Sequence, residues 1–206
     1  MGRFDLVIFD CDGVILDSRE ANRAYYNTIL ERFGRRLMND KELSFVHMHT
    51  AEESVEYLFK DDIAIQKDAL IYARTLDYTY FLDYLTVEPG IEDAIRSVRP
   101  PLLTAVFTNR STTMSKIIKI FGLDRWFDIV VCALDVSSPK PDPEGMFKIL
   151  DILGVEKDRT VYIGDSVIDE IVAHRAGIPL IAYKNNRLKA MFHVEHFEQI
   201  KSILSD

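Results

Sequence analysis

Short apolar runs bounded by polar or glycine residues recur along this chain, once near its start and four times after residue 100. They occupy residues 6–9, 102–107, 129–132, 160–163 and 178–183. Runs of this length and composition are typical of buried strands. Segments with apolar residues at helical spacing separate the later runs, and one such helix is expected from about Ser111 to Gly122. This alternation predicts an α/β fold, a doubly wound parallel sheet with helices on both faces.

Residues 17–86 follow a different pattern, which indicates an all-helical insertion. Ser18 is placed to cap a first amphipathic helix, and Thr50-Ala51-Glu52-Glu53 has the form of a capping box. Residues 62–72 and 75–85 carry further helical patterns. The predicted domains are an α/β core formed by 1–16 and 87–206 and a small helical domain formed by 17–86.

Polar side chains follow several of the apolar runs at the point where each predicted strand ends. Asp10 and Asp12 follow the first run, and residues two apart in an extended chain project to the same side. The others are Thr108 and Asn109, Lys140, and Asp165 and Asp169. Because the carboxyl ends of parallel strands meet at one edge of a sheet, we expect these side chains to share a site. Two carboxylates in one cleft repel, and a hard cation or a shared proton would relieve that repulsion.

Composition and charge limit the classes of function. The chain has 206 residues and a formal net charge of -8, which argues against a nucleic-acid partner because such a partner requires a basic face. It contains no apolar run of the roughly 18 residues that form a membrane helix, and its start lacks a signal-peptide pattern. We therefore expect a cytoplasmic protein without a membrane partner. Cys11 and Cys132 are expected to be reduced core thiols.

Four short motifs occur in order along the predicted core. They are DCDGVILDS at 10–18, FTNRS at 107–111, KPDPEGM at 140–146 and GDSVIDE at 164–170. Together they resemble the four motifs of the haloacid dehalogenase superfamily, in the branch of the phosphoglycolate phosphatases and β-phosphoglucomutases. The resemblance implies the Rossmann-like core of that superfamily, and residues 17–86 would be its cap domain.

The same resemblance implies roles for the four aspartates. Asp10 would be the nucleophile that forms an aspartyl-phosphate, and Asp12 would be the general acid and then the base that activates water. A bound Mg²⁺ would be held by Asp10, Asp165 and the backbone carbonyl of Asp12, with Asp169 as a further ligand or a support. A dehalogenase needs no acid at Asp12, because halide leaves unprotonated, so this residue favours phosphate chemistry.

Three further residues are implied to bind the substrate phosphate. Thr108 would supply a hydroxyl, Asn109 an amide, and the helix that follows them free N–H groups. Lys140 would bring a positive charge that the overall composition lacks. Thr108 and Lys140 would thereby also act in catalysis, because phosphoryl transfer requires neutralisation of the phosphate oxygens.

The sequence therefore predicts a Mg²⁺-dependent phosphoric monoester hydrolase that acts on a small phosphorylated metabolite. One alternative is a sugar phosphomutase with the same nucleophile, and another is a non-catalytic binding or regulatory protein on the same fold. A pyrophosphatase or a phosphonate-cleaving enzyme of the same branch is also left open. His193 and His196 could approach a metal from one helix face, but without Asp or Cys companions we expect them to be surface residues.

Overall fold

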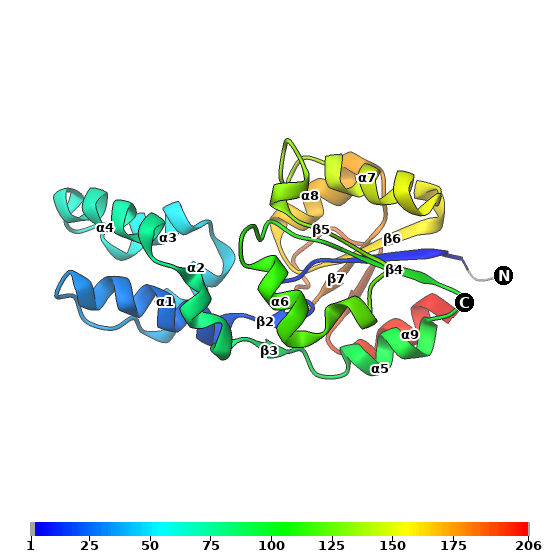
Figure 1. Ribbon diagram of the computed structural model, residues 1–206, viewed down its shortest axis with the longest axis horizontal. Helices are drawn as coiled ribbons and strands as arrows, with labels where there is room; N and C mark the ends of the chain where they lie inside the picture. Colours follow the sequence, from blue (N-terminus) through cyan, green and yellow to red (C-terminus); the bar gives the residue numbers. More distant parts are fainter. Residues whose placement is uncertain (1–2, 206) are drawn as a thin grey trace. The chain divides into compact units, whose positions relative to one another are not determined.

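The computed structural model describes residues 3–205. The chain divides into two compact units, one formed by Met1–Leu16 together with Val87–Asp206 and the other by Asp17–Thr86 (Figure 1). We call them the core unit and the helical unit, and each is described by itself.

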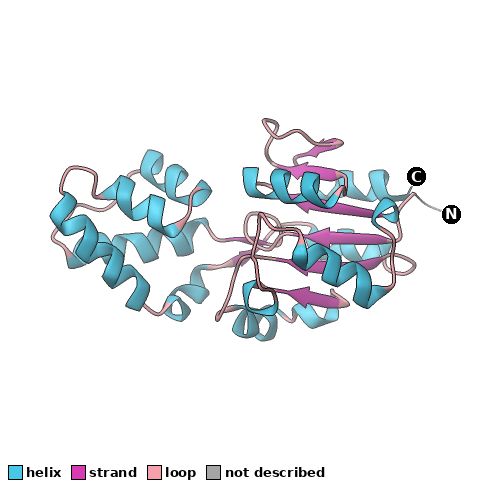
Figure 2. Cartoon of the chain, turned by 90° about the horizontal axis from the view of Figure 1, so that it is seen from above, coloured by secondary structure: helices cyan, strands magenta, loops and turns pink. Residues whose placement is uncertain are grey.

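The core unit contains a six-stranded sheet in the order β5-β4-β1-β6-β7-β8, with every neighbouring pair parallel. Its strands are β1 (Leu6–Phe9), β4 (Leu103–Phe107), β5 (Ile129–Val131), β6 (Thr160–Gly164), β7 (Leu180–Tyr183) and β8 (Phe192–Val194). Figure 2 shows the arrows of this sheet pointing in one direction. In the register, Ile8 lies beside Ala105 on one side and Tyr162 on the other. The predicted parallel α/β sheet is confirmed, with β8 as a strand that the apolar pattern did not indicate.

Helices cover both faces of this sheet. They are α5 (Ile91–Val98), α6 (Met114–Phe121), α7 (Glu144–Leu153), α8 (Val167–Ala176) and α9 (Phe197–Ser205). In Figure 1, α7 and α8 lie on one face, and α5 and α9 lie on the opposite face. The predicted start of α6 at about Ser111 is wrong by three residues, because the Met114 N–H donates to the Ser111 carbonyl in a turn that precedes the helix.

The order in which the chain adds strands to the sheet changes side at β1, and this change positions the candidate site. From β1 the chain continues to β4 and β5 on one side of the sheet and then returns to β6, β7 and β8 on the other. The connections that leave β1, β4 and β6 therefore separate at the carboxyl end of β1, which leaves a crevice for ligands in folds of this type. Asp10 is the first residue after β1.

The helical unit contains four α-helices and a 3₁₀ helix among its described residues. They are α1 (Arg19–Arg32), α2 (Asp40–Met48), α3 (Ala51–Leu58), α4 (Ile63–Thr75) and η1 (Tyr78–Tyr84). The capping box predicted at Thr50 is present, with reciprocal hydrogen bonds between Thr50 and Glu53. Ser18 occupies the N-cap position of α1, but the carboxylate of Asp17 accepts the N–H of Arg19 in its place.

The chain enters and leaves the helical unit through two short paired strands, β2 (Leu16–Asp17) and β3 (Thr86–Val87). The helix expected over residues 75–85 is a 3₁₀ helix instead, because Asp77 is extended and its carboxylate accepts the Thr79 N–H at the start of that turn. Among the described residues, no helix has both the length and the hydrophobicity needed to cross a bilayer.

Candidate active site

Asp10 lies where β1 gives way to a tight turn. Its N–H donates to the Ile163 carbonyl at 2.8 Å, so the sheet hydrogen bonding continues to this residue, and its side chain is buried. Gly13 then turns the chain with φ of +78°, and a Cβ at this position would lie 2.1 Å from an oxygen of Asp165. The turn therefore requires glycine both for its backbone conformation and for the close approach of the Asp165 carboxylate.

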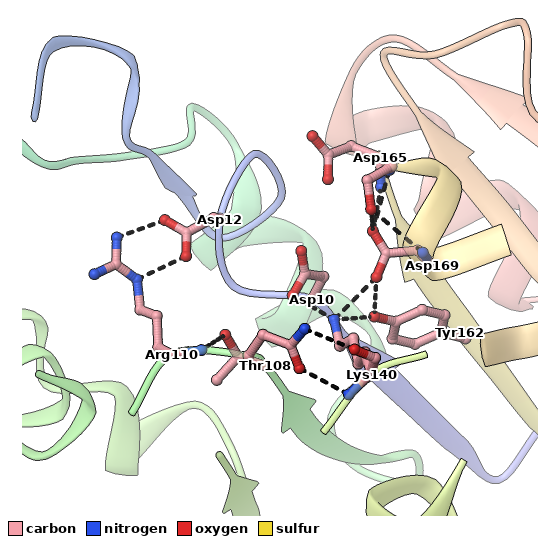
Figure 3. Close-up of polar contacts among 10 residues, drawn as sticks. Asp10, Asp12, Thr108, Arg110, Lys140, Tyr162, Asp165 and Asp169 are labelled. Carbon is pink, nitrogen blue, oxygen red and sulfur yellow. Dashed lines mark hydrogen bonds and ion pairs between the residues drawn. The ribbon is translucent and has the colours of Figure 1, made fainter. Parts of the chain in front are cut away.

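Lys140 is the centre of a buried hydrogen-bond network (Figure 3). Its Nζ donates to Asp10 Oδ1 at 2.6 Å, to Asp169 Oδ1 at 2.9 Å and to the Tyr162 hydroxyl at 2.6 Å. The Tyr162 hydroxyl in turn donates to the same oxygen of Asp169 at 2.6 Å. An ammonium group has three N–H donors, and each of them is used here, so the charge of Lys140 is directed at the carboxylate predicted to be the nucleophile.

The loop that carries Lys140 is held by Asn109. The Asn109 amide donates to the Lys140 carbonyl at 3.0 Å, and its oxygen accepts the Lys140 N–H at 2.8 Å. In this arrangement Asn109 orients Lys140 through its backbone, which is a different contact from the phosphate contact that the sequence suggested. Thr108, also buried, accepts the Arg110 N–H with its hydroxyl oxygen at 3.1 Å, and this bond leaves the hydroxyl hydrogen available to a phosphate oxygen.

Asp169 joins Lys140 to the start of α8. One of its oxygens accepts from Lys140 and Tyr162, and the other accepts from the Ser166 hydroxyl at 2.6 Å and from the N–H groups of Ser166 and Asp165. Because both oxygens are engaged in this way, we interpret Asp169 as a support that orients Lys140 and the Asp165 backbone.

Burial and charge together shift the protonation of this cluster. Burial raises the pKa of Asp10 to about 7; Lys140 opposes the shift, and the charges of Asp169 and Asp12 add to it. Burial, with the charges of Asp10 and Asp169, also raises the pKa of Asp165 well above its usual value. Burial opposes ionisation of Asp169, but the charge of Lys140 and three side-chain hydrogen bonds outweigh it and lower the pKa of that residue.

The carboxylates fit a divalent cation. Asp10, Asp165 and Asp169 each have a carboxylate oxygen within 4.8 Å of the other two. Because both oxygens of Asp169 already accept hydrogen bonds, Asp10 and Asp165 are the side chains that would hold the ion. Burial is the largest cause of the raised pKa values of Asp10 and Asp165, and the neighbouring carboxylates add to it, since Lys140 supplies one positive charge against three carboxylates. Mg²⁺ prefers oxygen ligands and would neutralise the excess negative charge, so this donor set suits it.

Asp12 points away from this cluster and pairs with Arg110 (Figure 3). The Arg110 Nε donates to Asp12 Oδ2 at 2.7 Å, and Nη2 donates to Oδ1 at 2.5 Å. The Asp12 side chain is 36% exposed and that of Arg110 is 9% exposed. Of the two carboxylates Asp10 and Asp12, Asp12 is therefore the one that retains more access to solvent.

The structure brings all seven predicted residues to one edge of the sheet, with Asp12 directed away from Lys140, and adds two that the sequence reasoning missed. The missed residues are Arg110 and Tyr162. The sequence did offer a signal for Arg110, because it is the positively charged residue of the FTNRS motif. Tyr162 had no such signal, because it lies inside an apolar strand. The interpretation of His193 and His196 as members of one helix face is wrong: His193 lies in β8, His196 precedes α9, and both are exposed.

Comparison with known proteins identifies similar sequences along most of the chain. Residues 7–183 match the sequence model of a family described as haloacid dehalogenase-like hydrolase, a range that includes all four motifs. The chain is 26% identical over 201 residues to the pyrophosphatase PpaX of Listeria innocua, covering 96% of this chain and 90% of that protein. It is also 26% identical over 186 residues to a phosphorylated carbohydrates phosphatase of Thermotoga maritima, covering 86% of this chain and 83% of that protein.

A solved structure is similar over the whole fold. The crystal structure of a haloacid dehalogenase superfamily hydrolase, subfamily IA, from Geobacter sulfurreducens is 34% identical, with a TM-score of 0.85. The alignment covers 98% of this chain and 97% of that one. Both the sequence and the fold therefore match the same group of proteins.

Proposed function

This chain belongs to the haloacid dehalogenase-like hydrolase family and is a phosphoric monoester hydrolase, and from this we propose a mechanism. The protein cleaves small phosphomonoesters with Mg²⁺, and the reaction passes through an aspartyl-phosphate on Asp10. The observation that supports this most directly is the buried contact between Asp10 and Lys140 at the carboxyl end of β1, beside Asp165. The contact fixes one carboxylate oxygen of Asp10 and leaves the other for attack on phosphorus.

In the first half of the reaction, an oxygen of Asp10 attacks the phosphorus in line with the leaving group. The bond from phosphorus to the ester oxygen breaks, its electron pair stays on that oxygen, and Asp12 supplies the proton. When bound, Mg²⁺ would neutralise the charge of the phosphate oxygens and of the carboxylates that hold it. Lys140 keeps Asp10 oriented, and Thr108 offers its hydroxyl to a phosphate oxygen.

In the second half, water replaces Asp10 on phosphorus. Asp12, now ionised, takes a proton from the water as its oxygen attacks, and the bond from phosphorus to Asp10 breaks with return of the electron pair to the carboxylate. The products are inorganic phosphate and the free Asp10. We further propose that the helical unit, residues 17–86, is a cap that limits water access until the aspartyl-phosphate has formed.

Pyrophosphate is the second substrate that we consider, because the pyrophosphatase PpaX of Listeria innocua is similar to this chain over most of its length. The same steps would apply to it, with phosphate as the leaving group. Phosphorylated carbohydrates are the corresponding monoesters suggested by the Thermotoga maritima relative.

The test is phosphate release from a panel of phosphorylated compounds, with and without Mg²⁺. The panel contains pyrophosphate, phosphoglycolate and several sugar phosphates, and the variants are Asp10→Asn and, as a matched control, Asp151→Asn at an exposed position of α7. We expect Mg²⁺-dependent release by the wild type and by Asp151→Asn and none by Asp10→Asn. Equal release by Asp10→Asn would refute the proposal, and isomerisation of a sugar phosphate without release would replace it with a phosphomutase.

A further inference from the structure

Arg110 holds the carboxylate of Asp12 by two parallel hydrogen bonds. The bonds join Nε to Oδ2 at 2.7 Å and Nη2 to Oδ1 at 2.5 Å, which is the bidentate geometry that a planar guanidinium makes with a carboxylate. Two such bonds fix the plane of the carboxylate as well as its position. The two residues are 98 positions apart in the chain, so the pair forms only in the folded core unit.

Arg110 is itself firmly held. Its N–H donates to the Thr108 hydroxyl oxygen at 3.1 Å, and its carbonyl accepts the Ala133 N–H at 2.9 Å. Its Nη1 also lies 3.4 Å from the hydroxyl of the buried Thr113. The arginine is thus anchored to the ends of β4 and β5, and its 9% exposed side chain has little freedom to move.

The chemistry of arginine limits what Arg110 can do. A guanidinium only donates hydrogen bonds and keeps its proton at any working pH, so Arg110 is neither an acid nor a base. It contacts the carboxylate to which the proposed reaction assigns both proton transfers. Any part that Arg110 takes in these proton transfers therefore passes through Asp12.

We propose that Arg110 is a positioning residue: it holds Asp12 directed away from the Lys140 cluster, toward the side of phosphorus opposite Asp10 where the leaving-group oxygen and then the attacking water lie in an in-line reaction. When Asp12 carries the proton, one of the two bonds opens, because an O–H and an N–H are both donors, while the other bond keeps the carboxyl group in place. After the proton passes to the leaving oxygen, the second bond forms again. This inference rests on the proposed function, since it assigns Arg110 to the Asp12 of that mechanism.

The proposal predicts that the effect of Arg110 depends on the leaving group. An alkyl phosphate releases an alkoxide that needs the proton of Asp12, whereas 4-nitrophenyl phosphate releases a stabilised phenolate that leaves without one. We expect Arg110→Gln to lower kcat for the alkyl ester by about 10- to 100-fold, by analogy with the loss when a hydrogen-bond partner that orients a metal ligand is removed. For 4-nitrophenyl phosphate we expect a loss severalfold smaller, with KM for both esters nearly unchanged.

Two further variants separate this role from a structural one. In an Asp12→Asn background, Arg110→Gln should cause no additional loss on the alkyl ester, because the group through which it acts is already gone. Arg110→Lys retains a donor for one carboxylate oxygen and should recover part of the activity. Thermal unfolding of each variant shows whether the fold is kept, and Arg110→Lys provides the test if Arg110→Gln does not fold.

Four results would overturn the proposal. Equal losses on the two esters would assign Arg110 to the fold, and a further loss in the Asp12→Asn background would show that it acts independently of Asp12. A rise in KM confined to substrates with a second anionic group would make it a substrate-binding residue. The proposed function is tested separately: it is refuted if Asp10→Asn keeps its activity. If Asp10→Asn is inactive but Arg110→Gln is fully active, the proposed function stands and only the role of Arg110 is refuted.

Discussion

Replacing Lys140 with methionine would remove the ammonium group that three buried side chains share. The side chains of Lys140, Asp10 and Asp169 are 3%, 12% and 1% exposed, so water cannot take the place of the lost donor. Methionine is an unbranched side chain that keeps most of the aliphatic stem, while it removes the Nζ that lies 5.3 Å from the ring centroids of Phe107 and Tyr162. The change therefore tests charge and hydrogen bonding more than packing.

The expected magnitude follows from the number of buried charges left without a partner. Removing one partner of a buried ion pair costs about 3–5 kcal/mol of unfolding free energy, because the remaining charge is desolvated and unpaired. In the wild type Asp10 has a raised pKa of about 7 and is protonated at pH 5.5, so at that pH only the pair with Asp169 is lost. We expect the full loss at pH 8 and about half of it at pH 5.5.

The measurement is urea denaturation of Lys140→Met and wild type in a chelating buffer at the two pH values. Lys116→Met, at an exposed position of α6, is the matched control and should change the unfolding free energy by less than about 0.5 kcal/mol. A loss below about 1 kcal/mol at pH 8, or a loss as large at pH 5.5 as at pH 8, would refute the reasoning. In a separate assay at pH 8 with Mg²⁺, phosphate release should be lost in Lys140→Met, since Asp10 is then no longer oriented.

Two further predictions concern Asp10 and Gly13. The native state holds the proton of Asp10 to a higher pH than the unfolded chain, where the pKa is near 3.8, so the unfolding free energy of the metal-free protein should fall between pH 5 and pH 7. Two pH units at 1.36 kcal/mol each set an upper limit of about 3 kcal/mol, and urea titrations that show the same slope in Asp10→Asn would contradict this assignment. Gly13→Ala should cost about 1–2 kcal/mol for its left-handed backbone and also displace Asp165, weakening the Mg²⁺ dependence of phosphate release. Gly154→Ala, at φ of +65° with nothing within 4 Å of the new Cβ, should carry only the backbone cost, and equal effects of the two changes on Mg²⁺ dependence would refute the role of Gly13.

Much of the fold and of the candidate site could be predicted because each depends on local pattern. The apolar run Leu6–Phe9 is typical of a buried strand, and the polar residues that follow it in the sequence must lie at the carboxyl end of that strand. Parallel strands bring those ends to one edge, so Asp10, Lys140 and Asp165 could be grouped without knowledge of their distances. The capping box at Thr50 could be predicted for the same reason, since both partners lie within three residues.

Short or ambiguous segments were predicted less well. Three residues form β8, and the exposed His193 at its centre interrupts any apolar run. The residues before α6 are equally compatible with a turn and a first helical turn, and the hydrogen bond from Met114 to Ser111 decides between them. Local pattern carries no information on such choices, because the competing conformations differ by little in free energy.

By itself, the sequence determined the α/β class, the order of most strands and helices of the core, and the carboxylates and lysine that converge on one edge of the sheet, because these follow from periodicity and from the ends of apolar runs. Only the tertiary structure decided which groups touch. Tyr162 donates to Asp169 because β6 and the start of α8 bring them together, and Arg110 meets Asp12 because β4 lies beside β1. Hydrogen bonds between side chains depend on distances of a few tenths of an ångström across segments far apart in the chain, and that precision arises only when the whole core unit has packed.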